Sequence, residues 1–355
     1  MTGFENSDGT DQPSRTRRTL LKAAAGAGAA ASTGAAGCVS ITTPADVAAS
    51  SDLGGNIGYF VGPSTLAQRR EEVVALDARS REAYREQRVY GARHVPLEDF
   101  TATRDTPAGS VPDTASIAAA LGQLGVSPQD DVVVYGSSVG SRVTRTAFAL
   151  EACGHAGEVM LLNGGFDAWN GRVGTGSSPT RTPVSHDGTA RQDLWVTAEW
   201  LTDHIGEFNA DGPGLVDVRQ PDAYLGATSS ETPATATDRQ GHLPGAINVH
   251  WLGNVAGRQL PDPGELYTLY TSQAELDTDR PVVVYGGENV DPTSTWLVLR
   301  AIGFDDVRLY DGGFSEWANL DDRGRFPVET ATQVVIETDG EVGGGTDGGD
   351  FSCTG

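Results

Sequence analysis

Short, nearly continuous apolar runs recur along the chain and are separated by polar, glycine-rich segments. Four or five such residues in a row are typical of a strand in a parallel sheet whose two faces are both covered by helices. We therefore expect strands at positions 73–76, 132–135, 158–162, 215–218, 282–285 and 307–310.

Each of the two VVVY runs is followed, across a tight loop, by a helical pattern over residues 142–153 or 292–302. Gly154 and Gly303 stand where these helices should end, because glycine readily adopts the left-handed conformation that closes a helix. A strand, a loop, a helix and a further strand form a βαβ unit, and several such units in series predict a three-layer α/β fold.

The second half of the chain repeats the first. Four motifs recur in the same order at offsets of 140 to 154 residues, which indicates a duplication. The pairs are VVALDAR at 73–79 with GLVDVR at 214–219, Gly91-Ala92 with Gly245-Ala246, DVVVYG at 131–136 with RPVVVYG at 280–286, and NGGFDAW at 163–169 with DGGFSEW at 311–317. A polar insert near residues 227–238 accounts for much of the difference between the offsets and is predicted to be a surface loop.

This order of motifs resembles the rhodanese family of thiosulfate and mercaptopyruvate sulfurtransferases, in its tandem-domain form. The resemblance implies two rhodanese-like three-layer domains, each a parallel sheet with helices on both faces. We place them at residues 59–172 and 194–328, joined by a linker at 173–193. In two-domain members of the family, usually only the second domain is catalytic.

The resemblance also implies a particular chemistry. Sulfur transfer in this family proceeds through a persulfide on a cysteine that follows the VVVY-type strand and precedes a helix. Backbone N–H groups and the helix N-terminus lower the pKa of that thiol, so that a thiolate is available. In this chain the two corresponding residues are Gly136 and Gly286. Because glycine has no side chain, we assign no catalytic residue, and whether the chain is an enzyme stays open.

The two loops differ in their chemistry. The second carries Glu288 and Asp291, which would repel an anion, and Asp291-Pro292 has the pattern of a helix N-cap followed by proline, so we interpret this loop as structural. The first loop is either a simple turn or a cradle for a small oxyanion such as thiosulfate, to which charge-assisted hydrogen bonds contribute about 1.5–3 kcal/mol each. The candidate anion-binding residues are Gly136, Ser137, Ser138, Val139, Gly140, Ser141 and Arg142.

The three cysteines lie outside both loops. We expect Cys153, near a helix end, to be buried and structural, and Cys353 to lie in a disordered, acidic, glycine-rich tail at 329–355. The leading hypothesis is a tandem rhodanese-like protein without persulfide chemistry of its own, which acts as an anion-binding or scaffolding module and has a protein partner. The alternative is an active thiosulfate sulfurtransferase that uses Cys153, Cys353 or a thiol of a partner.

A serine hydrolase is the third hypothesis. Residues 136–140 fit the G-x-S-x-G pattern, which would make Ser138 the nucleophile. The chain has no HGGG-type oxyanion loop, and no histidine stands in a recognisable catalytic context; we expect His242, like Arg79 and Arg219, to be structural. Metal-ligand spacings and phosphate-binding glycine motifs are also missing from the sequence, so we predict neither a metal nor a cofactor.

The first 38 residues resemble an export signal. They contain Arg17-Arg18 followed by apolar residues and a lysine, as in twin-arginine signals. An Ala/Gly stretch of about 15 residues comes next, too short to span a bilayer, and small residues before Cys38 resemble a lipobox. With residues 39–58 as a polar tether, we expect a protein on the outer face of the cell membrane, attached to it only through a lipid on Cys38.

Charge narrows the possible partners and the environment. Against 48 acidic residues stand 25 basic ones, of which only Lys22 is a lysine, and the net charge is −23. Such a surface repels nucleic acid. In about 1 M salt the Debye length falls to about 3 Å and self-repulsion is screened, so we expect a halophilic protein; an acidic protein of an ordinary cell is the alternative.

Overall fold

The structure is a computed structural model that describes residues 59–96, 100, 113–177, 181–227, 237, 239–287, 292–330, 333–338 and 341–342. The predictions for the export signal, Cys38, the tether, Cys353, most of the polar insert and the acidic residues of the second loop lie outside these residues. Within them, no helix has the length and apolar character needed to cross a membrane.

The first half contains a five-stranded sheet in the order β1-β6-β5-β2-β4, with all neighbouring strands parallel. Its strands are β1 (Phe60–Val61), β2 (Val74–Asp77), β4 (Arg93–His94), β5 (Val132–Tyr135) and β6 (Val159–Leu162). A separate antiparallel pair consists of β3 (Arg88–Val89) and β7 (Val173–Gly174). The helices are α2 (Pro63–Arg69), α3 (Arg81–Glu86), α4 (Thr114–Gln123), α5 (Ser141–Ala152) and α6 (Gly165–Ala168).

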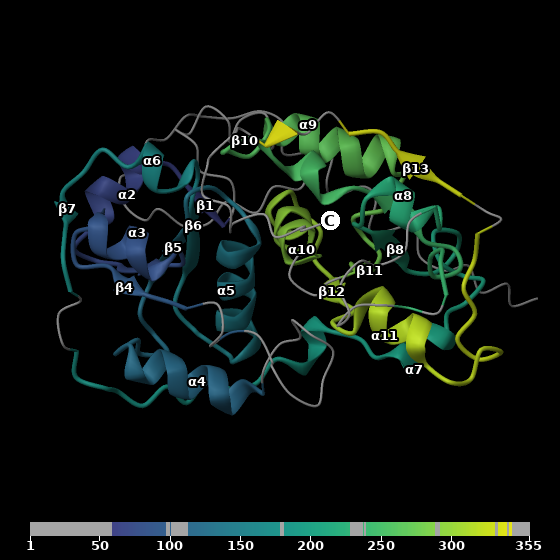
Figure 1. Ribbon diagram of the computed structural model, residues 1–355, viewed down its shortest axis with the longest axis horizontal. Coiled ribbons are helices and arrows are strands. Elements are labelled where there is room, and N and C mark those ends of the chain that lie inside the picture. The colour runs from purple at the N-terminus through teal and green to yellow at the C-terminus, as the bar shows by residue number, and fades with distance from the viewer. Residues whose placement is uncertain are drawn as a thin grey trace, which may run out of the picture. The chain divides into compact units, whose positions relative to one another are not determined.

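The second half repeats this arrangement in a sheet of the order β12-β11-β8-β9-β13, again with all neighbours parallel (Figure 1). Its strands are β8 (Gly214–Asp217), β9 (Ile247–Val249), β11 (Val282–Tyr285), β12 (Val307–Leu309) and β13 (Val335–Ile336), and β10 (Ala256–Gly257) pairs separately with β14 (Glu341–Val342). The helices are α7 (Ala198–Thr202), α8 (Pro221–Tyr224), α9 (Pro263–Thr268), α10 (Pro292–Ala301) and α11 (Gly313–Asn319). Short 3₁₀ turns cover Gln192–Leu194 and Trp251–Asn254, and a π-helical turn covers Leu269–Gln273.

The predicted strands, the two predicted helices and the α/β fold class are confirmed. Continuous apolar strands arise because both sheet faces are covered: along β5, Val132 and Val134 pack with α4 and α5, whereas Val133 and Tyr135 pack with α2 and α3. The helices also end where expected, since Gly154 and Gly303 have φ angles of 76° and 105°.

The two halves belong to one unit of the chain and share buried core. Helices α5 and α10 pack against each other between the two sheets, as Figure 1 shows. Phe148 of α5 meets Trp296 of α10 edge to face, with ring centroids 4.9 Å apart. Burial of such large aromatic rings is a major source of stability in any core, so the halves stabilise one another.

Two segments differ from their expected roles. The linker begins as part of the first half, because Val173–Gly174 forms β7 and pairs with β3. The tail that the sequence predicts to be disordered from residue 329 begins as ordered structure: the backbones of Glu329 and His242 exchange hydrogen bonds, and β13 pairs with β9. Low sequence complexity starts only after these residues, and the apolar Val334 to Ile336 stretch supplies the extra edge strand.

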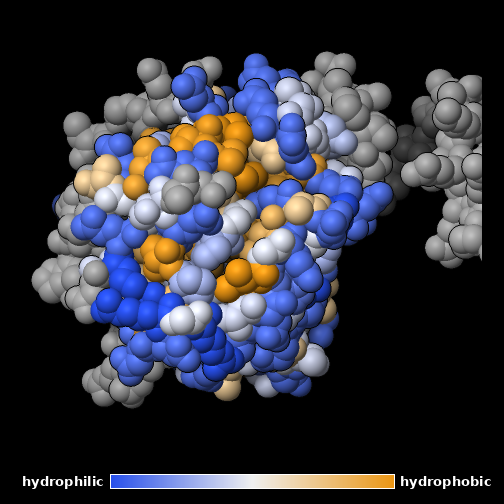
Figure 2. All heavy atoms as spheres, turned by 90° about the vertical axis from the view of Figure 1, so that its right-hand side faces the viewer, coloured by the Kyte–Doolittle hydropathy of each residue, from blue (hydrophilic) through white to orange (hydrophobic). Residues whose placement is uncertain are grey.

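Figure 2 shows one face of the molecule, on which hydrophilic residues dominate and apolar residues gather in separate patches. Large apolar side chains that are more than a third exposed in the described chain are few: Tyr90, Val173, Val184 and Val334.

Candidate functional site

The carboxyl ends of β2 and β5 place an aspartate beside a tyrosine. Their strand register pairs Asp77 with Tyr135. The buried Asp77 carboxylate accepts hydrogen bonds from Arg79 Nε at 3.0 Å, from Arg79 Nη2 at 2.7 Å and from the Tyr135 hydroxyl at 2.7 Å. Burial, and then the negative charge of Asp77, raise the pKa of Tyr135, so the phenol stays protonated and acts as a donor.

The same arginine connects this pair to the N-G-G-F motif. The guanidinium carbon of Arg79 lies 3.8 Å from the ring centroid of Phe166, a cation–π contact. The Phe166 N–H in turn donates to the carbonyl of Gly136 at 2.8 Å. The G-A motif lies beside them, because Ala92, whose carbonyl accepts from the Tyr84 hydroxyl, is buried in one cluster with Tyr135 and Phe166. Three of the repeated motifs are thus joined by these contacts at the base of the loop that follows β5, and the fourth packs against them.

The second half builds the same network. Arg219 donates to Asp217 at 3.0 and 2.6 Å, its guanidinium lies 4.0 Å from the ring of Phe314, and the Phe314 N–H donates to the carbonyl of Gly286 at 2.8 Å. Arg79 and Arg219 form buried ion pairs with Asp77 and Asp217, in agreement with the prediction that both arginines are structural.

Close packing explains the second glycine of each G-G-F motif. Gly165 and Gly313 have φ angles of 64° and 59°, a conformation that side chains of L residues rarely adopt. At Gly165 a Cβ atom would also lie 2.5 Å from the carbonyl oxygen of Ser137. The motif is therefore a means of holding the loop after β5 tightly against the turn after β6.

The first loop, Gly136–Gly140, is itself densely packed. A Cβ atom on Gly136 would lie 2.7 Å from Cγ2 of Val143 and 3.1 Å from the carbonyl oxygen of Ser138. A side chain at this position, including that of cysteine, requires Val143 to move. Gly136 in this structure is thus a packing glycine as well as a residue without a functional group.

The candidate anion-binding residues divide into two sets. Gly136, Ser138, Val139 and Gly140 are buried, whereas Ser137, Ser141 and Arg142 are half-buried. Ser138 is only 4% exposed, and its hydroxyl has no hydrogen-bond partner within the described chain. The loop also leads directly into the N-terminus of α5, a helix of 12 residues with no side-chain cap at Gly140. An uncapped helix N-terminus presents N–H donors and partial positive charge.

The second loop is described only at its ends. Gly286 is buried, the Gly287 carbonyl accepts a hydrogen bond from the Ser315 hydroxyl at 2.7 Å, and α10 begins at Pro292 as the sequence predicts. The predicted roles of Glu288 and Asp291 fall on residues 288–291, which the description does not include.

With this geometry known, a comparison with protein families becomes informative. The family model of the rhodanese-like domain matches residues 63–172 and again residues 197–320. The chain belongs to the rhodanese family. Each half of the structure is therefore one rhodanese-like domain, and the duplication inferred from the motifs is a tandem of such domains.

Similar proteins include sulfurtransferases of several organisms. A thiosulfate sulfurtransferase of Corynebacterium glutamicum is 33% identical over 225 residues, which cover 61% of this chain and 72% of that protein. A thiosulfate sulfurtransferase of Pseudomonas aeruginosa is 29% identical over 284 residues, which cover 77% of this chain and 98% of that protein.

Solved structures show the same fold. SseA from Escherichia coli, a 3-mercaptopyruvate sulfotransferase, superimposes with a TM-score of 0.61 at 23% identity, covering 72% of this chain and 98% of that one. A 3-mercaptopyruvate sulfurtransferase from Leishmania major does so with a TM-score of 0.62 at 18% identity, covering 75% of each chain.

Among the described residues of this rhodanese-like chain, the free thiol is that of Cys153. It is 1% exposed, its Sγ lies 3.2 Å from the carbonyl oxygen of Leu150, and burial raises the pKa of the thiol to about 11. Cys153 also follows the last turn of α5, whereas the Gly136 loop precedes its first, so about 18 Å of helix separates them. The prediction that Cys153 is buried agrees with this environment.

The arrangement around Ser138 does not support the hydrolase hypothesis. All six histidines are described, and Ser138 Oγ forms no hydrogen bond with any of them. His242 is fully buried, and its Nδ1 lies 2.9 Å from the carbonyl oxygen of Tyr224, in agreement with the predicted structural role. A serine without a neighbouring base is a weak nucleophile.

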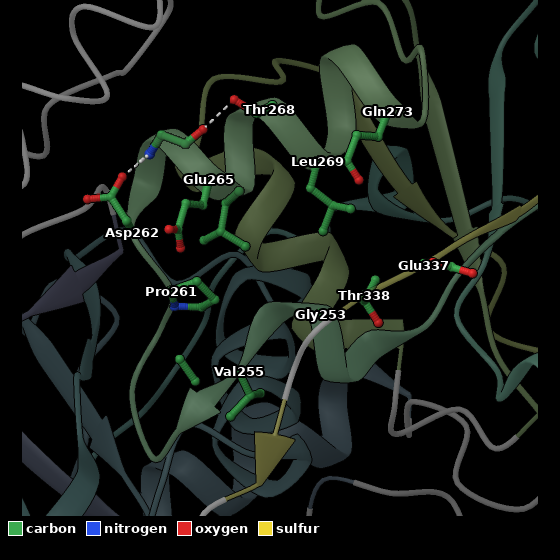
Figure 3. A pocket seen from close by; sticks show the side chains of 13 residues that line it. Gly253, Val255, Pro261, Asp262, Glu265, Thr268, Leu269, Gln273, Glu337 and Thr338 are labelled. Carbon is green, nitrogen blue, oxygen red and sulfur yellow. Dashed lines mark hydrogen bonds between the residues drawn. The ribbon is translucent and has the colours of Figure 1, made fainter.

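One cavity of about 630 Å³ lies beside α9 in the second half. Figure 3 shows the Asp262 carboxylate accepting the Gly264 N–H and the Thr268 hydroxyl donating to the Gly264 carbonyl. Glu265 and Glu337 also line this cavity. Its acidic lining makes it unsuitable for an oxyanion. Neither here nor elsewhere in the described parts of the chain do three His, Cys, Asp or Glu side chains gather as metal ligands.

Contacts between the halves are the feature that the sequence did not predict. Arg145 of α5, fully buried, forms an ion pair with Asp311 at 3.1 Å. Conversely, the Leu260 N–H of the second half donates to Asn163 Oδ1 of the first half at 3.1 Å. Asn163 and Asp311 are the equivalent first residues of the two G-G-F motifs. The signal in the sequence was a polar residue at the first position of the G-G-F motif in both repeats, but nothing in the sequence indicates its partner.

Proposed function

We propose that this chain is an exported, lipid-anchored member of the rhodanese family that carries no persulfide of its own. It binds a small oxyanion such as thiosulfate at the Gly136–Arg142 loop and serves as a binding or scaffolding module. The proposal for export and anchoring comes from the N-terminal sequence, and the proposal for binding comes from the loop.

The observation that carries the proposal is the residue that follows the VVVY strand. It is Gly136 in the first half and Gly286 in the second, at the place where the family resemblance puts the persulfide cysteine. Cys153 offers no substitute, since it is buried, protonated at neutral pH and separated from the loop by the length of α5. A thiol must be ionised and accessible to attack a sulfur donor.

Three features support anion binding at the first loop. The N-terminus of α5 is uncapped by a side chain, the buried Ser138 hydroxyl lacks a partner, and Arg142 stands in the first turn of the helix. The N-terminal turn of α10 lies beside that of α5, because the hydroxyl oxygens of Thr144 in α5 and Thr293 in α10 are 2.9 Å apart. Two adjacent helix N-termini increase the positive potential. We name thiosulfate as the oxyanion because two similar proteins are thiosulfate sulfurtransferases.

The absence of persulfide chemistry is tested by measuring the thiosulfate:cyanide sulfurtransferase activity of the chain from residue 39 onward, in molar salt. The proposal expects no turnover above the rate without protein. Turnover that disappears in Cys153→Ser or Cys353→Ser would establish the alternative, an active sulfurtransferase with an unexpected thiol. Turnover that requires an added thiol protein would point to a partner's thiol.

Binding is tested separately by calorimetric titration with thiosulfate. Arg142→Gln and Ser138→Ala should each weaken binding, and Arg323→Gln, which removes an exposed arginine of the other half, should not. Equal affinity of all four proteins would refute binding at this loop. A fluorophosphonate probe completes the set, since covalent labelling of Ser138 would revive the hydrolase hypothesis.

Anchoring is tested by fractionating cells that produce the full chain. Lipidation predicts that the wild-type chain sediments with membranes and that Cys38→Ser is released. A wild-type chain found only in the soluble fraction would contradict the anchor.

A further inference from the structure

Four arginines surround a second cavity, of about 610 Å³, in the first half. Arg70 follows α2, Arg88 lies in β3, Arg93 lies in β4, and Arg181 comes from the segment after β7, which is labelled at the left edge of Figure 1. Val73, Val74 and Ala75 form the floor at the start of β2. The Gly136 loop lies beyond the end of the neighbouring strand β5, so this cavity is at the opposite end of the sheet.

The charges of these four arginines are not paired with a described carboxylate. Elsewhere, arginines such as Arg79, Arg219 and Arg308 each face an aspartate within 2.7 Å. None of the four that line the cavity forms an ion pair with any described residue, and three of them donate to backbone carbonyls instead. Arg88 donates to the carbonyls of Tyr84, Thr175, Gly176 and Ser177, Arg70 to those of Val73 and Tyr90, and Arg181 to that of Gly91.

Unused donors remain in the cluster. Nε of Arg70, Nε of Arg88 and Nη1 of Arg93 are buried and have no hydrogen-bond partner within the described chain. Arg88 as a whole is only 4% exposed. A buried charged donor without an acceptor lowers the stability of the folded chain. A bound anion that accepts hydrogen bonds from these groups would remove that cost.

The positive charges also act on one another. Burial is the largest cause that lowers the pKa of Arg93, and the charges of Arg181 and Arg70 lower it further, although Asp130 opposes them. Burial and the charge of Arg181 lower the pKa of Arg70, against the opposing effect of Glu71. The carboxylates at this cavity, Glu71 and Glu72, belong to exposed residues at its rim. Like charges held together in this way favour an anion between them.

We propose that this arginine cavity binds a ligand that carries two or more phosphate or sulfate groups. Guanidinium groups match tetrahedral oxyanions because their N–H donors form paired hydrogen bonds. The volume lies within the range of small-molecule sites, roughly 300–1,000 Å³, and exceeds what one tetrahedral anion fills. The site is independent of the Gly136 loop, and it would give this chain a second anion ligand.

The test is calorimetric titration of the chain from residue 39 onward with inorganic pyrophosphate and with orthophosphate, in chloride of constant ionic strength. Pyrophosphate should bind at least tenfold more tightly than orthophosphate. Arg93→Met should weaken pyrophosphate binding at least tenfold, because it removes an arginine with an unused donor. Arg323→Met, an exposed arginine of the other half, and Arg142→Gln, in the first loop, should leave the affinity unchanged.

Thermal melting provides the second readout. Without ligand, Arg93→Met should melt at the wild-type temperature or above, because the variant relieves repulsion within the cluster. Pyrophosphate should raise the melting temperature of the wild type and not that of Arg93→Met. Absence of pyrophosphate binding to the wild type, or equal affinity of wild type and Arg93→Met, would overturn the proposal. Loss of binding in Arg142→Gln instead would place the ligand at the first loop.

Discussion

At the scale of single residues, the account depends on Gly136 and Gly286, the glycines that follow the two VVVY strands. Gly136 accepts the Phe166 N–H through its carbonyl and has no space for a Cβ atom beside Val143. The absence of a side chain at this position can be read directly from the sequence, in which Gly136 follows the VVVY strand. The sequence could not predict the tight packing, which depends on where the side chain of Val143 points in α5.

Gly136→Ala should therefore destabilise the protein. The new methyl group overlaps Cγ2 of Val143, and overpacking of this kind costs about 1–3 kcal/mol. Gly324→Ala is the matched control, since its Cβ would meet nothing closer than 3.5 Å, and it should change stability by less than about 0.5 kcal/mol. Chemical denaturation measures both; equal stabilities of the two variants would contradict the packing argument.

The buried thiol of Cys153 makes a prediction about reactivity. With a pKa of about 11, Cys153 has roughly a hundredfold less thiolate at pH 8.5 than a thiol with an ordinary pKa. Iodoacetamide should modify it far more slowly in the folded than in the unfolded chain, as peptide mass mapping would show. Because its pKa is raised, the contribution of this thiol to stability is complete below about pH 9 and is lost as pH rises through about 11. Alkylation of the folded chain at the unfolded rate would contradict the buried position.

At the scale of elements, α5 and α10 hold the two halves together. Their positions, lengths and ends could be predicted from the apolar pattern and from Gly154 and Gly303. The ion pair between Arg145 and Asp311 could not, because its partners are 166 residues apart and belong to different repeats. A repeated motif identifies equivalent residues, whereas contacts between the repeats depend on how their surfaces meet.

Asp311→Ala should be strongly destabilising. It leaves the fully buried Arg145 without the carboxylate 3.1 Å away, and breaking one side of a buried ion pair costs about 3–5 kcal/mol. The control is Asp193→Ala, which breaks an exposed pair with Arg191 and should cost less than about 1 kcal/mol. Denaturant midpoints compare the two, and a loss at Asp311 as small as that at Asp193 would show that the pair contributes little.

At the scale of the whole molecule, the internal duplication and the net negative charge were the two features most informative in the sequence. The repeat was sufficient to predict two parallel-sheet domains and the family, because four motifs recur in the same order. The arginine cavity could not be predicted, since its residues come from four separate segments and only the fold gathers them. The halophilic character remains a prediction from composition.

That prediction concerns salt. If mutual repulsion of a chain with net charge −23 limits stability, the melting temperature should rise steadily as sodium chloride increases from 0.1 M to above about 1 M, where charges are screened within about 3 Å. Differential scanning calorimetry of the chain from residue 39 onward measures this. A melting temperature that does not respond to salt would favour the protein of an ordinary cell.

The most direct test of the central claim, that no thiol in this chain carries sulfane sulfur, is the intact mass of the protein after incubation with thiosulfate in molar salt. The account predicts an unchanged mass. An added mass of about 32 Da, the signature of a persulfide, that is lost on treatment with cyanide would contradict it and would make Cys153 or Cys353 the sulfur carrier.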